Sequence, residues 1–140
     1  MVPAKPVGNP MISHIFIGVN DFPAAYRFYD ALLTSLGHVL RFREDGRPWA
    51  GWQAPGVARP LFVIGAPEDG NPATIGNGTM VALLAPTRAA VDAAHAVGLA
   101  MAGSDAGSPG LRPHYHADYY GAYLRDPEGN KIALACHISG

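Results

Sequence analysis

A faint internal repeat constrains the fold of this chain more than any other feature. Residues 11–19 form an apolar, β-branched stretch that is typical of a buried strand, and residues 79–85 repeat it. His14 in the first stretch corresponds to Met80 in the second, 66 residues later. The alternative is that two unrelated strand–helix units coincide by chance, but the features that follow share the same spacing.

A helical pattern follows each of these two strands. Asp21, with Asn20 beside it, and Thr87 are the capping residues, and they lie 66 residues apart. Gly37 and Gly103 end the two helical patterns at the same spacing. Apolar positions between cap and glycine recur at helical intervals, so one face of each helix is predicted to pack inward.

The remaining strands repeat at a longer spacing of 71 residues. The segment Trp49-Ala50-Gly51-Trp52 corresponds to Tyr120-Gly121-Ala122-Tyr123, and residues 61–64 correspond to residues 132–135. One insertion of five residues between Gly103 and Tyr120 accounts for the change. Turn residues separate the predicted strands, which cover residues 38–44, 48–53, 60–65, 119–125 and 130–138.

The repeat predicts an α+β fold of two tandem βαβββ modules whose mixed sheets enclose a cavity. Module one covers residues 11–66, a linker covers 67–77 and module two covers 78–138, all in one domain; residues 1–10 are predicted to be a mobile tail. A helix covers only one face of each sheet, so the other faces must meet each other or a partner chain. Both arrangements, within one chain or exchanged across a dimer, stay open, and the enclosed space is a predicted ligand cavity.

Charge and cysteine content exclude several classes of protein. Ten Lys and Arg against eleven Asp and Glu give a net charge of −1, and charged residues make up only 15% of the 140-residue chain. A nucleic-acid surface or a polybasic membrane anchor is therefore not expected. The single cysteine, Cys136, excludes an internal disulfide framework, is expected to pack under a helix, and favours a reducing, cytoplasmic location.

The two halves resemble the glyoxalase, bleomycin-resistance and extradiol-dioxygenase superfamily, also called vicinal oxygen chelate proteins. An opening strand with His14 that runs to Asp21 carries part of the resemblance, and the closing segment YYGAYLRDPEGNKI, residues 119–132, is the specific part. The match spans residues 11–138. It implies paired modules that curl around a cavity, usually in a homodimer, and in metal-using members a divalent Fe, Mn, Ni or Zn ion.

The resemblance also implies where metal ligands would stand. The first-strand positions are His14 and Met80, and the last-strand carboxylate position is Ala133, with Phe62 as its repeat mate. Only His14 is a competent ligand, because these metals need about three imidazole or carboxylate donors. We therefore predict no cofactor and a cavity floor that His14, Met80 and Ala133 line; a divalent metal is the alternative.

Further ligand contacts are predicted from aromatic and basic residues. Strand alternation places at most one member of each aromatic pair in the cavity, and Trp52 and Tyr120 are the members assigned to it. Arg112, His114 and His116 belong to the inserted region and are predicted to form a loop over the cavity mouth. The alternative for the two histidines is an exposed loop without a role.

The sequence thus predicts a small-molecule-binding protein with a degenerate metal site and an apolar or aromatic ligand. The alternative is a metal-dependent lyase or dioxygenase whose site is rebuilt from His14 with His114, His116 or His137. A third, purely structural reading is a dimer module with a filled cavity. No residue is assigned a catalytic role, and the expected partners are the ligand and a second copy of the chain.

Overall fold

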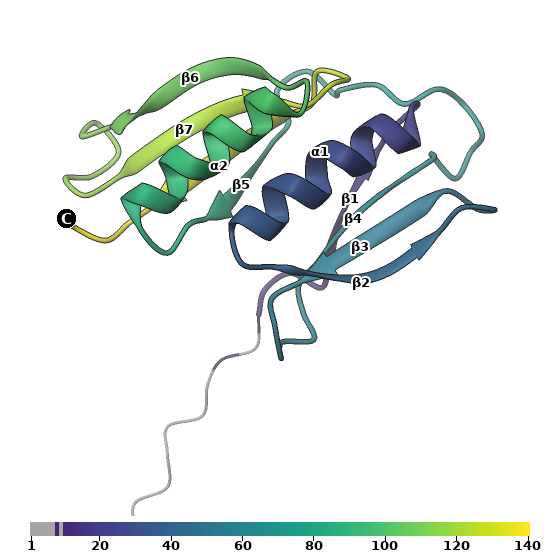
Figure 1. Cartoon of the computed structure of the whole chain (residues 1–140), viewed down its shortest axis with the longest axis horizontal. Helices are drawn as coiled ribbons and strands as arrows, with labels where there is room; N and C mark the ends of the chain where they lie inside the picture. Colours follow the sequence, from purple (N-terminus) through teal and green to yellow (C-terminus); the bar gives the residue numbers. More distant parts are fainter. Residues whose placement is uncertain (1–7, 9) are drawn as a thin grey trace, which may run out of the picture.

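The computed structural model describes residues 8 and 10–140 and shows two βαβββ modules joined by a linker (Figure 1). The predicted α+β fold of tandem modules is confirmed. The predicted tail, residues 1–10, lies outside the described residues except for residues 8 and 10. The elements are β1 (His14–Gly18), α1 (Phe22–Ser35), β2 (Val39–Glu44), β3 (Trp49–Gln53), β4 (Leu61–Gly65), β5 (Met80–Leu84), α2 (Arg88–Ala100), β6 (Ser104–Leu111), β7 (Tyr120–Arg125) and β8 (Lys131–Cys136).

Each module builds one mixed sheet of four strands. The strand orders are β1-β4-β3-β2 and β5-β8-β7-β6, so the two modules have the same topology. In each sheet the first strand of the module pairs in parallel with the last, and the other pairs are antiparallel. The first strand of each module, β1 or β5, is therefore an edge strand.

The helix caps that the sequence indicates are present. The Asp21 carboxylate accepts a hydrogen bond from the Ala24 amide, and the Thr87 hydroxyl accepts one from the Ala90 amide. A second carboxylate reaches the start of α1 from the other module, because Glu128 accepts hydrogen bonds from the Asn20 and Asp21 amides at 2.7–2.8 Å. Negative charge is favourable at this helix end.

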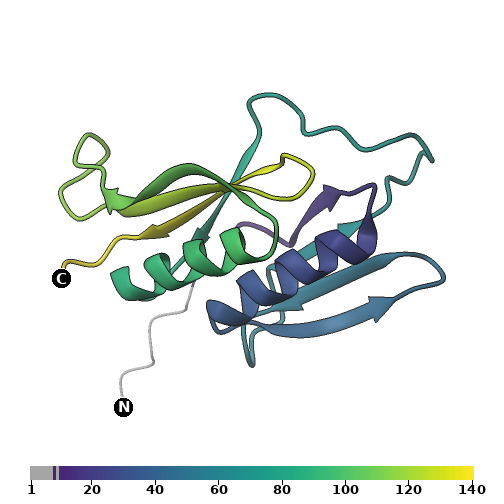
Figure 2. The same ribbon diagram turned by 45° about the horizontal axis from the view of Figure 1, so that its top comes forward.

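Each helix covers one face of its own sheet. The two helices lie side by side where the two modules meet (Figures 1 and 2). Phe28 of α1 packs against Gly98 of α2 and Gly103 just after it. The core lies under the helices and includes Cys136, which is fully buried as predicted. In the described part of the chain no helix covers the opposite face of either sheet, here called the helix-free face.

The strand register corrects the predicted spacing of the repeat. In the first sheet Trp52 lies opposite Phe62, and in the second sheet the equivalent pair under the helix is Leu124 and Ile132. The third strands are thus 72 residues apart and the fourth strands 70, where the sequence predicted 71 for both. Since side chains alternate along a strand, a shift of one residue moves every side chain to the other face.

The inserted region is also more ordered than a loop. Residues 107–111 belong to β6, which pairs with β7 through two irregularities, between Asp105 and Gly107 and between Gly107 and Gly110. The predicted loop is therefore limited to residues 112–119. Among the residues that the structure describes, neither helix is long and apolar enough to cross a membrane.

Candidate functional site

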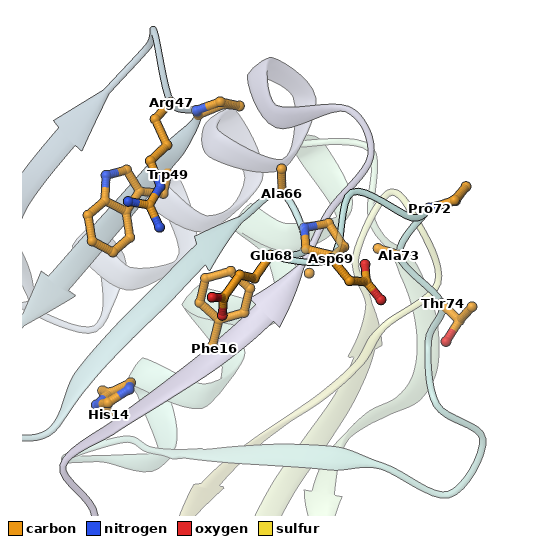
Figure 3. A pocket seen from close by; sticks show the side chains of 13 residues that line it. His14, Phe16, Arg47, Trp49, Ala66, Glu68, Asp69, Pro72, Ala73 and Thr74 are labelled. Atoms are coloured by element: carbon orange, nitrogen blue, oxygen red, sulfur yellow. The ribbon is translucent and has the colours of Figure 1, made fainter.

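A broad cavity of about 1030 Å³ lies on the helix-free face of the first sheet (Figure 3). His14 and Phe16 reach it from β1, and Trp49 reaches it from β3. The linker forms the opposite wall, where Glu68 and Asp69 contribute carboxylates. The cavity therefore combines an aromatic floor with a polar rim.

Glycines shape this floor. A side chain added at Gly65 would begin 2.9 Å from the Trp49 Cβ and 3.2 Å from the Phe16 ring, and one at Gly51 would meet the Phe42 ring at 2.4 Å. The aromatic side chains therefore occupy space that the side chain of any other residue at Gly51 or Gly65 would need. The result is an apolar surface of three aromatic side chains on one sheet face.

The helix-free face of the second sheet repeats this arrangement. Tyr123 covers Gly107, and Tyr119 covers Gly121; a Cβ at either glycine would lie 2.7 Å from the tyrosine ring. Partial burial, together with a hydrogen bond to Tyr119, raises the pKa of Tyr123 above its usual value. The phenol is therefore neutral at physiological pH and available as a hydrogen-bond donor or acceptor.

Two cations flank Tyr123. The Arg112 guanidinium carbon lies 5.7 Å from the ring centroid, and the Lys131 ammonium lies 5.2 Å from it. The Arg112 guanidinium also donates a hydrogen bond of 2.7 Å to the Ser108 carbonyl, which fixes its orientation. This face therefore presents an aromatic surface together with positive charge.

A hydrogen-bonded histidine pair lies at the end of β8. His116 Nε2 and His137 Nδ1 are 2.8 Å apart, and the Asp118 amide donates to His116 Nδ1. Because His116 Nδ1 accepts that bond, the neutral ring carries its proton on Nε2 and donates it to His137. The lone pairs of His116 Nδ1 and His137 Nδ1 thus accept hydrogen bonds, and they are the lone pairs with which the two rings would chelate a metal.

His14 lies on the first sheet, apart from this pair. It is the exposed first residue of β1, and its Nδ1 lies 3.0 Å from the Ser13 hydroxyl. Met80, its repeat mate, begins β5 on the helix-free face of the second sheet and is 43% exposed. Both residues are thus available to a ligand.

Two predicted ligand residues lie on the helix side of their sheets. Trp52 is buried between β3 and α1, where its indole N–H donates to Asp30, and the Tyr120 hydroxyl donates to Asp92 of α2 at 2.6 Å. Their partners in the aromatic pairs, Trp49 and Tyr123, face the helix-free side instead. Both members of each pair are aromatic, so the sequence pattern alone does not decide which one lies toward the helix.

The other predicted contacts differ in accessibility. Arg112, His114 and His116 belong to the loop beside the second sheet, and the His114 ring packs against Tyr115. Ala133 lies on the helix-free face between Ala82 and Tyr123 but is fully buried. The glycines that Trp49 and Tyr123 contact are the signal in the sequence that marks the helix-free faces.

The donors present do not fit the metal that the superfamily implies. No three His, Cys, Asp or Glu side chains within residues 8 and 10–140 are grouped so that they would hold one ion. Met80 and Ala133, which the resemblance places at ligand positions, supply a thioether and a methyl group. His14 lies on a different sheet from the His116–His137 pair, so the described residues of one chain do not assemble the rebuilt metal site.

Fold and site together define a two-module βαβββ protein with two helix-free sheet faces that carry aromatic side chains. Residues 11–134 match the Glyoxalase/Bleomycin resistance protein/Dioxygenase superfamily, and the chain belongs to that superfamily. No curated protein matches the chain.

Solved structures agree with this assignment. A glyoxalase/bleomycin resistance protein from Albidiferax ferrireducens is 38% identical, with a TM-score of 0.78 over 92% of this chain and 100% of that one. A lactoylglutathione lyase from Agrobacterium tumefaciens is 18% identical, with a TM-score of 0.60 over 94% of this chain and 96% of that one. An antibiotic-binding protein from a Streptomyces species is 19% identical, with a TM-score of 0.62 over 95% of this chain and 100% of that one. The last two similarities concern the fold alone.

Proposed function

We propose that this protein binds an apolar or aromatic small molecule on its helix-free sheet faces. The observation that carries the proposal is that both faces are lined by aromatic rings packed over glycines: Phe16, Phe42 and Trp49 on the first, Tyr119 and Tyr123 on the second. Aromatic rings offer large apolar surfaces for stacking; Phe16 is 47% exposed and the other four residues are half-buried, so part of each set is open to a ligand.

Polar groups at the rim would orient such a ligand. His14 lies beside the aromatic floor of the first sheet, and Arg112, His114 and His116 border the second. A few fixed polar groups around an apolar surface are what small-molecule sites usually contain. The Streptomyces protein of this fold is an antibiotic-binding protein, so the fold is used for binding as well as in a lyase.

Binding without a resident metal is part of the proposal. His14 is the one competent donor among the implied ligand positions, and a single imidazole does not hold a divalent ion. Elemental analysis of the purified full chain after dialysis should find well below one equivalent of Fe, Mn, Ni or Zn. Retention of about one equivalent, lost in His14→Ala, would instead favour the lyase or dioxygenase alternative.

A second copy of the chain would complete the cavity. Phe16, Met80 and Leu84 are 47%, 43% and 70% exposed on the helix-free faces, and a partner that presents its own faces would cover them. We therefore include a homodimer in the proposal. A cytoplasmic location is also included, since the single cysteine is buried and the sequence offers it no disulfide partner.

The ligand-binding proposal is tested with Nile red, an uncharged apolar aromatic dye. Its fluorescence should rise on binding to the full chain, and Trp49→Leu or Tyr123→Leu should weaken that binding about tenfold, which corresponds to about 1.4 kcal/mol. Trp52→Phe is the matched control, because Trp52 faces the helix and should retain wild-type affinity. Equal affinity in all four proteins, or a loss confined to Trp52→Phe, would contradict the proposal.

A further inference from the structure

A second, smaller pocket of about 330 Å³ lies at one end of the second sheet. The segment from Ile75 to Met80, which ends at the first residue of β5, forms one wall, and Arg125 of β7 and Lys131 of β8 form the other. Gly76 and Gly78 have positive φ angles of 60° and 96°, so this wall turns tightly and carries few side-chain atoms. No acidic residue lines the pocket.

The two cations of this pocket are direct neighbours in the sheet. Arg125 and Lys131 are paired in the antiparallel register of β7 and β8. Like charges directly opposite each other on neighbouring strands destabilise a sheet. A bound anion would remove this unfavourable contact.

Nearby carboxylates do not neutralise the pair. Asp126 is buried and bonded to Tyr29 and Asn130, and Glu128 is bonded to the amides at the start of α1. The ion pairs present in the described part of the chain involve neither Arg125 nor Lys131. Both positive charges therefore remain available to a ligand.

The two side chains differ in how firmly they are held. Arg125 donates a hydrogen bond of 2.8 Å to the Gly129 carbonyl inside its own hairpin, which orients the guanidinium and leaves further N–H groups free. The Lys131 ammonium lies beside the Tyr123 ring. Thr79, also in the pocket wall, adds a hydroxyl group. Two cations and a hydroxyl around a small concave space match the donors that an oxyanion needs.

We infer that this pocket, formed by Arg125, Lys131 and the 75–80 segment, binds an oxyanion of the phosphate or carboxylate type. The inference goes beyond the proposed function, because it concerns a separate pocket and needs no aromatic ligand. It also adds a constraint: a ligand that reaches from Tyr123 past Lys131 would carry its negative group at this end.

The test uses inorganic phosphate and, in a parallel series, acetate, with ionic strength held constant by chloride. Either anion should raise the thermal unfolding midpoint of the full chain in a concentration-dependent way, since it binds only the folded state. Lys131→Gln should weaken the binding about tenfold by calorimetry, and should unfold at the same or a higher temperature without anion. The relative affinities for phosphate and acetate identify which group the pocket prefers.

Two further variants make the outcome decisive. Lys131→Arg keeps the charge and should keep anion binding. Arg27→Gln removes one positive charge from the exposed surface of α1 and should bind as the wild type does. If neither anion shifts the wild-type midpoint, or if Arg27→Gln and Lys131→Gln lose binding equally, the inference is wrong. Nile red binding reports on the proposed function separately.

Discussion

Tyr29 links the two modules through one buried hydrogen bond. Its hydroxyl donates to the Asp126 carboxylate at 2.6 Å, although the two residues lie in different modules. The Asp126 side chain also accepts from the amides of Glu128 and Asn130 and from the Asn130 side chain. These bonds compensate the carboxylate for its burial.

Tyr29→Phe removes that hydroxyl and keeps the ring, so it isolates the contribution of the bond. Hydrogen bonds to charged groups are worth about 1.5–3 kcal/mol, and we expect the free energy of unfolding to fall by about that amount. Urea unfolding followed by circular dichroism measures the change. Tyr115→Phe, at a 60% exposed side chain, is the control and should change stability by less than about 0.5 kcal/mol.

The same residue makes stability depend on alkaline pH. Burial, followed by the charge of Asp126, raises the pKa of Tyr29 well above 10.0. In the unfolded chain the phenol ionises near pH 10, so the stability linked to its proton is complete below that pH and is lost as pH rises through the folded-state pKa. Between about pH 9 and pH 11, Tyr29→Phe should therefore lose less stability than the wild type. If the free energy of unfolding falls equally steeply with pH in both proteins, the expectation is wrong.

For single residues, the sequence predicted aromatic pairs on the third strands of both modules but not which member of each pair lies toward the helix. It identified two aromatic pairs and assigned Trp52 and Tyr120 to the cavity, whereas Trp49 lines the cavity of the first sheet and Tyr123 lies on the helix-free face of the second. Both members of a pair are large and aromatic, so hydrophobicity alone does not distinguish the faces. Orientation depends on which strand register buries Phe62 and Ile132 under the helices, and that is a property of the packed core.

At the element scale, local signals predicted most of the fold. Caps, terminating glycines and turn residues act within a few residues of themselves, so the positions of α1 and α2 followed from the sequence. The strand β6 was partly missed because SDAGSPG has low β propensity. Its hydrogen bonds to β7, interrupted at two irregularities, hold this segment as a strand although its own sequence does not predict one.

The close contact between α1 and α2 depends on Gly103, which follows the end of α2. A Cβ there would lie 2.8 Å from the Gly98 carbonyl oxygen, 2.9 Å from the Arg125 carbonyl oxygen and 2.6 Å from the Phe28 ring. Backbone atoms do not move aside as a flexible side chain does. Gly103→Ala should therefore lower the free energy of unfolding by about 1–3 kcal/mol, despite the reduced entropy of the unfolded chain.

Chemical denaturation of Gly103→Ala and Gly46→Ala compares this site with a matched position. No atom lies within 4 Å of the place where a Cβ would stand at Gly46, so that variant should be neutral or slightly stabilised. If the two variants are equally stable, there is room for a methyl group at Gly103, and α1 and α2 pack less tightly there than the structure indicates.

At the scale of the whole molecule, the repeat predicted two modules but not how they pack. Two βαβββ units meet either through their helices or through their sheets, and the apolar pattern of each element is the same in both cases. Phe28 against Gly98 and Gly103, together with the Tyr29–Asp126 bond, selects contact through the helices. As a consequence, no helix covers the helix-free faces in the described part of the chain, and β1 and β5 are edge strands.

A homodimer is the assembly that this arrangement favours. Exposed edge strands with apolar residues on an uncovered face are sites of association in natural proteins. Light scattering on the full chain should give about twice the mass of 14.7 kDa, and Leu84→Arg should shift the population toward monomer, because Leu84 is a 70% exposed leucine on β5. Leu99→Arg introduces the same charge at a 42% exposed leucine on α2, away from the helix-free faces, and should remain dimeric. A monomeric wild type, or dissociation by Leu99→Arg alone, would mean that the helix-free faces do not form the interface and that each chain binds its ligand on an open surface.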